Sequence, residues 1–419
     1  MQVLVTPSER LAMARAVSRR GLLRSGAALA AAAAASPQAS GKPDRSILAY
    51  VGSYTPNGQG IYLFSLDLVT GELTQIKVAA AIPSPSWIAI HPNGKYLYAV
   101  NEVSNFTTSP PSGSVTALSI DRANGDLTVL NVVSSQGPGP AHLSVDPKGE
   151  FVYVANYGGG SFAVLPIKTD GSVGNATFVQ MDSGSVGPTK ATNAPPGSFA
   201  ISGHDAPHGH MMQADNAGKF VFGADLGQDR IYSWLLNRST GQLTANTPAF
   251  VTVPPGDGPR HFAFHPNGLF FYSLQEEAST LLFYTYDPTS GILSPQQMIS
   301  TLPPGFAGTN FTSEVRVSDD GKVVYAANRL HDTIAFFRVA PSGRLSRIGE
   351  ISTLGDYPRS FTVDPTGSFL ISCNQRSDAL TTFRIRGGSV WEGESVSGRV
   401  SFTGQYTPVG SPAIVVFLT

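Results

Sequence analysis

The chain has 419 residues, a net charge of −1 and only 14% charged residues. This weak charge balance gives no reason to expect a nucleic acid as a partner, because nucleic-acid-binding domains carry a basic patch. The single cysteine, Cys373, excludes an internal disulfide and a cysteine-based metal site. The 44 glycines and 31 prolines indicate many turns, and the 23 phenylalanines and 14 tyrosines suit β-strands.

The first 40 residues differ in composition from the rest. Arg19 and Arg20 precede a run of Ala and Leu, which ends in small residues and Pro37. This order resembles a twin-arginine export signal, and the apolar run Ala27–Ala35 is too short to span a bilayer. We therefore expect residues 1–40 to form a signal peptide and tail that the twin-arginine translocase reads during export. The alternative is a helical or disordered N-terminal tail.

Export predicts a periplasmic or extracellular location. After removal of the signal we expect no stable insertion into a membrane, because no other segment has the unbroken apolar length of a membrane helix.

From residue 47 onward the sequence repeats itself. Six units each contain an alternating apolar run, a turn that ends in glycine and a second alternating run. The aligned turn glycines are Gly94, Gly149, Gly218, Gly268, Gly321 and Gly367. Most units continue with a third run and then a turn such as NRSTGQL or DPTSGIL that leads into a fourth. Four antiparallel strands in roughly 50 residues describe one blade of a β-propeller.

A seventh unit is split between the two ends of the repeat region. ILAYVGSYT, GIYLFSLD and GELTQIKV near the start match second, third and fourth strands, and GSPAIVVFL at the end supplies a first strand. Pro412 stands there where other units have Pro85, Pro140, Pro259 and Pro358. The sequence therefore predicts that residues 47–419 form one all-β domain. It is a seven-bladed β-propeller of four-stranded antiparallel blades, closed by N- and C-terminal strands in one blade.

The register of the repeats predicts where a site lies. Residues equally far from a hairpin turn lie roughly opposite each other. Eight residues before the turn glycines stand Ser86, Ala141, His210, Arg260, Ser313 and Arg359, and eight after them stand Glu102, Tyr157, Leu226, Glu276, Arg329 and Gln375. Because first strands line the central channel, we expect all these positions at one channel mouth. The polar neighbours on first strands are His142, Glu314 and Arg316.

Several polar residues of the repeats have a structural explanation. Asn and Asp at strand ends are usually turn formers, which we expect of Asn156, Asp225, Asn328 and Asn374. His91 and His265 occupy the turn position that other units give to Asp. His208 is either a site residue or a packing residue. His204 lies in the longest insertion, around residues 183–209, which is either a loop or a lid.

The motifs in this order resemble one family. The most informative are PHGHMMQAD, GPRHFAFHPNG, SEVRVSDDGKVVYAANR and YPRSFTVDPTGSFLISCNQRSD. Over nearly all of 47–419 the chain resembles the seven-bladed lactonases, which include bacterial 6-phosphogluconolactonase of the propeller type and fungal carboxy-cis,cis-muconate cyclase. The resemblance implies catalytic roles for His210, Arg260, Glu276 and Arg329. It also implies substrate-binding positions at His142, Glu314, Arg316, Arg359 and Gln375.

Hydrolysis of a sugar lactone is the leading functional hypothesis, with a place in carbohydrate metabolism and no cofactor or metal. His210 or Glu276 would act as general base, and Arg260 and Arg329 would hold an anionic group and the developing oxyanion. The sequence shows no serine nucleophile elbow and no zinc-spaced histidine pair with a third ligand. The alternatives are a carboxymuconate-type cycloisomerase and a propeller that binds a ligand without catalysis.

Overall fold

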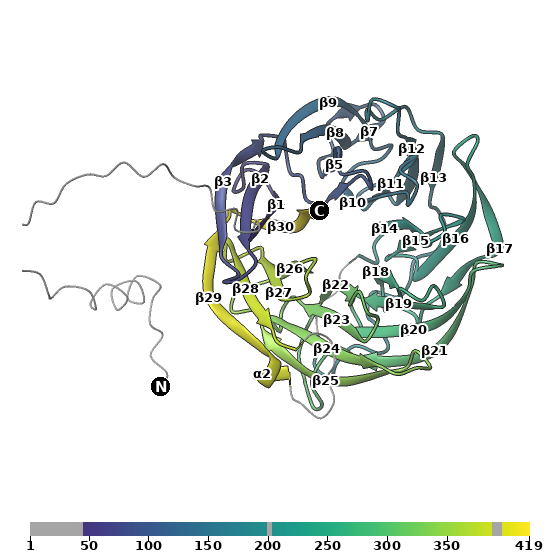
Figure 1. Cartoon of the computed structure of the whole chain (residues 1–419). Coiled ribbons are helices and arrows are strands. Elements are labelled where there is room, and N and C mark those ends of the chain that lie inside the picture. The colour runs from purple at the N-terminus through teal and green to yellow at the C-terminus, as the bar shows by residue number, and fades with distance from the viewer. Residues whose placement is uncertain (1–44, 199–202, 388–395) are drawn as a thin grey trace, which may run out of the picture. The chain divides into compact units, whose positions relative to one another are not determined.

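The computed structural model describes residues 45–198, 203–387 and 396–419, so the predicted signal peptide lies outside the described residues. The described chain forms seven four-stranded antiparallel sheets that radiate from a common axis as propeller blades (Figure 1). A further two-stranded hairpin is the only other sheet among these residues. The predicted all-β, seven-bladed propeller is thereby confirmed.

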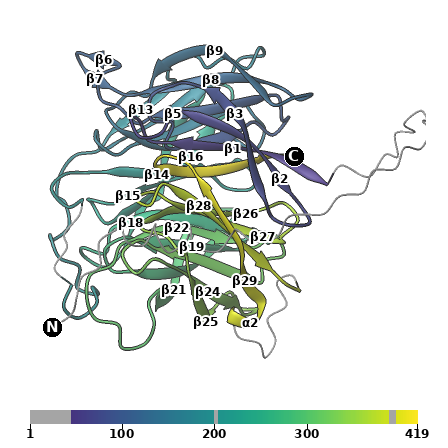
Figure 2. The ribbon, with the colours of Figure 1, turned by 90° about the vertical axis from the view of Figure 1, so that its left-hand side faces the viewer.

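Blade 1 closes the ring by joining both ends of the repeat region. Its strands, from the axis outward, are β30 (Pro412–Leu418), β1 (Ser46–Ser53), β2 (Ile61–Asp67) and β3 (Leu73–Ala80). The yellow β30 runs beside the purple β1 in both Figure 1 and Figure 2, and Tyr50 pairs with Val416. The closure predicted from Pro412 is confirmed, and blade 1 has the same four strands as the other six blades.

The other six blades follow in chain order. Blade 2 contains β4 (Ile88–Ile90), β5 (Tyr96–Asn101), β8 (Ser114–Asp121) and β9 (Asp126–Ser134), with the hairpin β6 (Thr107–Thr108) and β7 (Pro111–Ser112) between β5 and β8 in sequence. Blade 3 contains β10 (Pro140–Val145), β11 (Phe151–Asn156), β12 (Ser161–Pro166) and β13 (Phe178–Met181). Blade 4 contains β14 (Gly209–Ala214), β15 (Phe220–Asp225), β16 (Arg230–Asn237) and β17 (Gln242–Thr252).

Blade 5 contains β18 (Pro259–Phe264), β19 (Phe270–Gln275), β20 (Thr280–Asp287) and β21 (Ile292–Ser300). Blade 6 contains β22 (Thr312–Val317), β23 (Val323–Asn328), β24 (Thr333–Val339) and β25 (Leu345–Ser352). Blade 7 contains β26 (Pro358–Val363), β27 (Phe369–Asn374), β28 (Ala379–Ile385) and β29 (Val400–Pro408), and the short helix α2 (Val396–Arg399) precedes β29.

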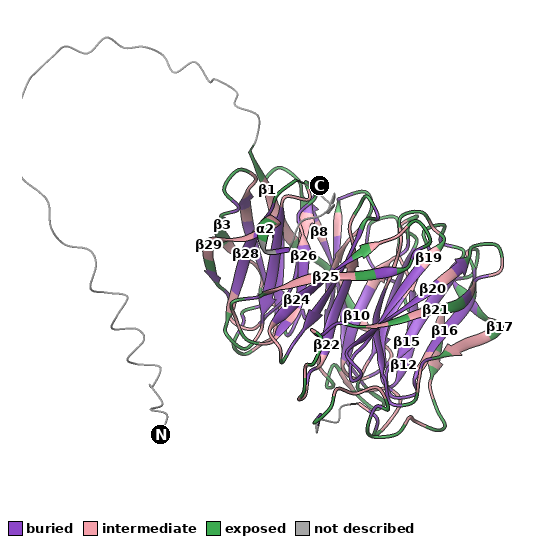
Figure 3. Cartoon of the chain, turned by 90° about the horizontal axis from the view of Figure 1, so that it is seen from below, coloured by how far each residue is buried: buried purple, intermediate pink, exposed green. Residues whose placement is uncertain are grey.

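The hydrophobic core lies between adjacent blades. Tyr153 and Phe162 of blade 3 pack with Met212 and Trp234 of blade 4, for example, and the central strands appear as buried purple ribbons in Figure 3. Each fully buried large apolar side chain stabilises the fold by about 1.5–3 kcal/mol. Apolar side chains on both faces of the middle strands therefore bind each blade to its two neighbours.

The hairpin turns contact the next blade. Gly149 has a left-handed backbone, with φ at 73°, which glycine adopts without strain. His91 of the preceding blade donates from Nε2 to the carbonyl of Gly149 at 3.0 Å, while its Nδ1 accepts the N–H of Asn93. His265 makes the same pair of bonds to Gly321 and Asn267. The prediction that both histidines are turn residues is confirmed.

A repeated β-bulge corrects the predicted register at the other end of these hairpins. Pro259 pairs with Gln275 and His261 pairs with Leu274, so Arg260 has no partner of its own. The same one-residue shift occurs at Ala141, His210 and Arg359. Counting eight residues from each turn glycine therefore identifies the correct end of the hairpin, but it does not give the correct backbone partners. A bulge breaks the strict alternation of side chains, which re-aims the bulged residue.

Candidate active site

One carboxylate joins two arginines at the bulged end of blades 5 and 6. Arg260 Nε lies 2.9 Å from Glu276 Oε2, and Arg329 Nη2 lies 2.5 Å from Glu276 Oε1. Arg260 comes from the bulge of β18, and Glu276 and Arg329 directly follow β19 and β23. All three are buried, with exposed fractions of 2%, 6% and 3%. The structure thus brings together three of the four predicted catalytic residues in one ion-pair group.

Further contacts fix the two guanidinium groups. Arg260 donates from Nη1 to the carbonyl of Ser313, and Arg329 donates from Nη1 to the hydroxyl of Tyr357 at 3.1 Å. The guanidinium carbon of Arg329 also lies 5.1 Å from the ring centre of Tyr357 and 5.5 Å from that of Phe311. Cation–π contacts of this kind stabilise a buried arginine. Both cations are therefore held in place before any ligand arrives.

The charge state of Glu276 follows from these neighbours. Burial alone would raise the pKa of its carboxyl group, but the guanidinium groups of Arg329 and Arg260 hold that pKa below its usual value. Burial and the nearby cations Arg359 and Arg329 lower the pKa of Arg260 to about 9, so it stays charged at neutral pH. Glu276 is thus an ionised group engaged by two cations, which makes it a poor general base.

A layer of imidazoles lies next to this ion-pair group. The ring centres of His210 and His261 are 5.1 Å apart, and those of His142 and His261 are 5.4 Å apart. Trp87 packs against two of these rings, at 4.7 Å from His142 and 5.1 Å from His261. Burial, together with adjacent cations such as Arg260, holds the pKa of all three imidazoles well below 6.5. They are neutral at physiological pH.

The ring nitrogens of this layer differ in their partners. His261 donates from Nδ1 to Glu314 Oε2 at 3.0 Å, which fixes its tautomer and leaves Nε2 as the unprotonated nitrogen. His210 Nδ1 is buried and has no hydrogen-bond partner among the described residues. Tyr157 meets the ring of His210 edge to face at 5.5 Å. His210 can therefore be a neutral proton acceptor beside the cation of Arg260.

A second, more accessible arginine lies near the first group. Arg359 Nη2 is 3.9 Å from Glu102 Oε2, and 17% of its side chain is exposed. Glu102 also accepts hydrogen bonds from Tyr54 at 2.7 Å and from Ser86 at 2.5 Å. Arg359 is close enough to Arg260 to lower the pKa of that guanidinium group. Arg260, Arg329 and Arg359 thus lie among the carboxylates Glu276, Glu102 and Glu314, and such a group suits a strongly polar ligand.

Arg316 and Gln375, the other two residues of the predicted substrate set, have different neighbours. Arg316 stands three residues beyond Ser313 on β22; its Nε donates to the carbonyl of Phe361 at 3.0 Å and lies 3.6 Å from Glu314 Oε1. Arg316 also lines the cavity of about 620 Å³ that His142 and Glu314 line. Gln375 follows β27, and its backbone N–H donates to Tyr357; its side chain makes no hydrogen bond with the described residues.

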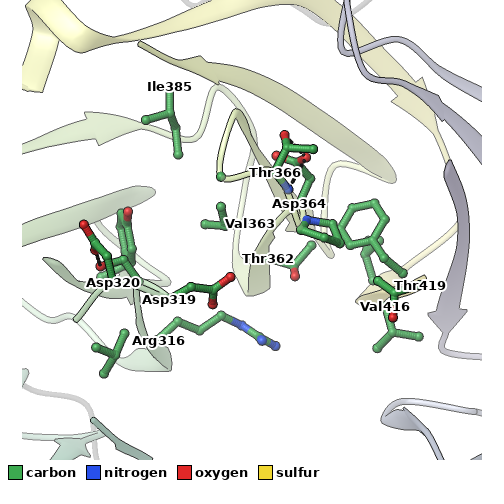
Figure 4. Close-up of a pocket in the computed structure, with 17 residues that line it drawn as sticks. Arg316, Asp319, Asp320, Thr362, Val363, Asp364, Thr366, Ile385, Val416 and Thr419 are labelled. Carbon is green, nitrogen blue, oxygen red and sulfur yellow. Dashed lines mark hydrogen bonds between the residues drawn. The ribbon is translucent and has the colours of Figure 1, made fainter. Parts of the chain in front are cut away.

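Two cavities lie toward the turn face of the propeller. A cavity of about 620 Å³ follows the channel axis from the turns up to His142 and Glu314. Figure 4 shows a second cavity, of about 610 Å³, that contains Arg316 and Asp364. Asp364 caps its own hairpin turn by accepting the N–H of Thr366 at 3.0 Å. Neither cavity is lined by Arg260, Glu276 or Arg329.

The strand-end Asn and Asp residues are structural, as predicted. Asn328 donates to the carbonyl of Thr301 and accepts a hydrogen bond from the hydroxyl of the same residue. Asp225 accepts the backbone N–H of His208 at 3.0 Å. His208 itself stacks on Tyr157 with ring centres 4.2 Å apart and donates from Nδ1 to the Tyr157 carbonyl. Of the two interpretations of His208, packing is the one that fits.

Sequence reasoning missed three residues of the site. Tyr357, Trp87 and His261 contact the predicted residues, and none was assigned a role beforehand. The available signal was their position near a proline at the start of a blade or beside a bulge: Tyr357 precedes Pro358, His261 follows the bulged Arg260, and Trp87 stands two residues after Pro85. Within the described part of the chain, no group of three or more His, Cys, Asp or Glu side chains is placed to hold a metal ion. No described helix is long and apolar enough to cross a membrane.

The closed ring of seven four-stranded antiparallel blades defines the class of the protein as a β-propeller. The family model described as "Lactonase, 7-bladed beta-propeller" matches residues 48–417. The chain belongs to this lactonase family.

Named relatives extend over nearly the whole propeller. The 6-phosphogluconolactonase of Bacillus subtilis (strain 168) is 34% identical over 373 residues, which cover 88% of this chain and 98% of the relative. The 6-phosphogluconolactonase of Formosa agariphila is 32% identical and covers 80% of this chain and 91% of the relative. The structure of Pseudomonas aeruginosa periplasmic gluconolactonase superposes with a TM-score of 0.78 at 28% identity, covering 89% of this chain and 99% of that one.

Proposed function

We propose that this protein hydrolyses the ester bond of a sugar lactone at the bulged mouth of the channel. The observation that carries the proposal is the group of Arg260, Glu276 and Arg329 beside the neutral imidazole of His210. The relatives named 6-phosphogluconolactonase and gluconolactonase support this substrate class. The name 6-phosphogluconolactonase denotes a phosphorylated lactone as substrate, and the name gluconolactonase denotes a lactone without phosphate. Both lactones are therefore candidate substrates.

The proposed reaction needs three functions from the site. His210 accepts a proton from a water molecule, whose oxygen forms a bond with the lactone carbonyl carbon. The guanidinium groups of Arg260 and Arg329 stabilise the negative charge that develops on the carbonyl oxygen. The tetrahedral intermediate then breaks the ring C–O bond, and the proton passes from His210 to the leaving oxygen. The product is the open hydroxy acid.

Glu276 supports this reaction without exchanging a proton. Its ionised carboxylate holds two arginines at a fixed separation, so they need no reorganisation when the oxyanion forms. Arg359, the partly exposed cation, is placed to meet an anionic or hydroxyl-rich part of the substrate. His142 and Glu314 would act from the adjacent imidazole layer as substrate-binding or orienting groups.

We further propose that the protein acts outside the cytoplasm. The twin-arginine pattern of residues 1–40 supports export through the translocase, and a relative of known structure is a periplasmic gluconolactonase. Removal of the signal would leave residues 47–419 as the catalytic propeller. This proposal is tested by fusing residues 1–46 to a reporter that is active only after export. The same fusion with Arg19→Lys and Arg20→Lys is the inactive control.

A substrate screen tests the proposed reaction. The purified protein is assayed at neutral pH with phosphorylated and plain sugar lactones and with muconates, corrected for spontaneous ring opening. We expect lactone opening and no muconate cyclisation. Failure to open any lactone, or cyclisation in its place, would overturn the proposal.

Two substitutions test the residue assignment within the same assay. Arg260→Ala removes one oxyanion donor and should lower kcat by roughly 10²- to 10³-fold. Arg238→Ala is the matched control, because Arg238 forms a comparable ion pair with Asp146 at 2.8 Å on the turn face. Its activity should stay near that of the wild type. Equal activity of the two variants would show that the site lies elsewhere.

A further inference from the structure

His204 lies in the long insertion, yet its side chain is buried between two carboxylates. Its Nε2 is 3.1 Å from Asp229 Oδ1 and its Nδ1 is 3.1 Å from Glu277 Oε1. The exposed fraction of the imidazole is 0%, and those of the two carboxylate side chains are 7% and 2%. We call His204, Asp229 and Glu277 the histidine latch. None of its members takes part in the reaction described above.

The latch contacts the backbone that carries Arg260. Asp229 accepts the N–H of Gly256 at 2.6 Å and that of Gly258 at 2.9 Å. These two glycines lie in the loop that leads into β18, and Gly258 is two residues before Arg260. Both have left-handed backbones, with φ at 78° and 68°, so the loop has an unusual path that these bonds hold. A shift of Asp229 would therefore move the start of β18.

The latch also contacts the segment that carries Glu276. Glu277 is the next residue, so its bond to His204 fixes the chain direction just after the site carboxylate. The N–H of Glu276 donates to the carbonyl of Gly258 at 2.7 Å, and that of Glu277 donates to the carbonyl of Asp257 at 3.1 Å. The loop before Arg260 and the segment around Glu276 are thus held to each other and to one imidazole.

The third connection runs along the chain to His210. Only five residues separate His204 from His210. Between them, His208 is held by Asp225 through its backbone and stacked on Tyr157. A fixed His204 therefore sets where this short segment enters β14. His204 is thus connected to the segments that carry His210, Arg260 and Glu276, which belong to two blades.

We propose that His204 is a positioning residue, which sets the relative placement of His210, Arg260 and Glu276 through the histidine latch. The inference rests on the proposed lactonase function for its kinetic readout. The two carboxylates raise the pKa of His204 to about 10 against the effect of burial, so it is an imidazolium at neutral pH and can donate from both nitrogens. Asp257 and Asp205 are the other acidic groups close to it.

The test compares His204→Ala with a control that weakens a partly exposed ion pair on the turn face. Asp146→Asn weakens the contact with Arg238 on the turn face and should lower Tm without changing kcat or KM. His204→Ala should lower kcat by roughly 10- to 100-fold, because small misplacements of reacting groups have effects of this size. His204→Lys, which keeps a cation between the carboxylates, should recover part of that loss. If His204→Ala does not fold, His204→Gln takes its place in every comparison.

A spectroscopic readout separates the latch from the reaction. The Nε–H resonance of Arg260, identified by its loss in Arg260→Lys, should shift in His204→Ala and keep its position in Asp146→Asn. If the Arg260 resonance shifts in His204→Ala but the wild type hydrolyses no lactone, the result would support the latch and contradict the proposed function. An unchanged resonance together with wild-type kcat in His204→Ala would overturn the latch, whatever happens to Tm.

Discussion

Glu276 and His210 show how the same burial has opposite consequences for two groups. The carboxylate lies between Arg260 and Arg329, whose charges more than compensate for the loss of water, so the acid stays ionised. The imidazole has cations and no carboxylate beside it, so burial and Arg260 act in the same direction and keep it neutral. This difference in charge state is why we propose His210, and not Glu276, as the proton acceptor.

The pH dependence of catalysis follows from the pKa of His210. A base must be unprotonated, and its pKa lies well below 6.5. Activity should therefore stay constant as the pH falls from 8 through the ordinary histidine range of about 6.5, and decline only below it. The measurement is the pH profile of kcat/KM with a stable lactone between pH 5 and 8. A decline centred on 6.5 or above would contradict this assignment.

The three buried imidazoles also predict an acid-sensitive fold. Between their lowered pKa values and about 6.5, the unfolded chain binds more protons than the folded one. The contribution of these three imidazoles to the free energy of unfolding should therefore decrease as the pH falls below about 6.5, whereas Asp257, whose pKa burial raises to about 7, has the opposite effect. Urea unfolding at pH 7.5 and 5.5 measures this decrease. His261→Asn, which removes one imidazole, should show a smaller difference between the two pH values.

At the scale of the strand, a repeated β-bulge presents two of the proposed catalytic residues, His210 and Arg260. The backbone shift recurs in blades 3, 4, 5 and 7, while the bulged residue is Ala141, His210, Arg260 or Arg359. The backbone bulge is thus the same in these four blades, and the blades differ in which side chain occupies it. A bulged residue escapes the alternation that would otherwise assign it to one face of the blade.

Strand-end asparagines have the complementary, structural role. Asn374 donates to the hydroxyl of Thr381 at 3.0 Å and to the carbonyl of Thr353, and it accepts a hydrogen bond from Ser372. Asn374→Ala should lower the free energy of unfolding by about 1–3 kcal/mol, because it leaves buried groups unpaired. Urea denaturation gives this value, and kcat at 25 °C should be unchanged. The exposed Asn216, replaced by alanine, is the control with an effect below about 0.5 kcal/mol.

At the scale of the whole molecule, the ring depends on the pairing of β30 with β1. Strand β30 is buried between its own blade and the first strands of both neighbours, and Ala413, Ile414 and Val415 are almost completely inaccessible. Without it, β1 would present an unpaired inner edge toward the channel. Closure is therefore a condition for the fold and for a common mouth.

Removal of residues 412–419 tests this dependence. The shortened chain should lose its cooperative thermal transition and aggregate through the exposed edge. Circular dichroism during heating and size-exclusion chromatography measure the two effects. A chain that lacks Thr419 alone, which is exposed and outside β30, is the control and should behave as the wild type. A monomeric, active protein without β30 would contradict the role of closure.

The repeat was sufficient to predict the seven blades, the shared closing blade and the level of the mouth residues. These features depend on backbone periodicity and turn chemistry, which successive residues carry and which a single sequence displays. For the same reason Arg260, Glu276 and Arg329 could be placed at one mouth from their distance to Gly268 and Gly321 alone.

Tertiary structure decided which of these residues contact one another, and it also decided the charge state of each. Arg260 and Arg329 are 69 positions apart, and only the angle between blades 5 and 6 brings both to one carboxylate. Arg316 shows the same point, since its position on β22 does not reveal that its Nε donates to the carbonyl of Phe361 and lies beside Glu314. The role of His204 was equally hidden, because its partners come from two other blades. Contact and pKa depend on distances and burial in three dimensions, which no local pattern encodes.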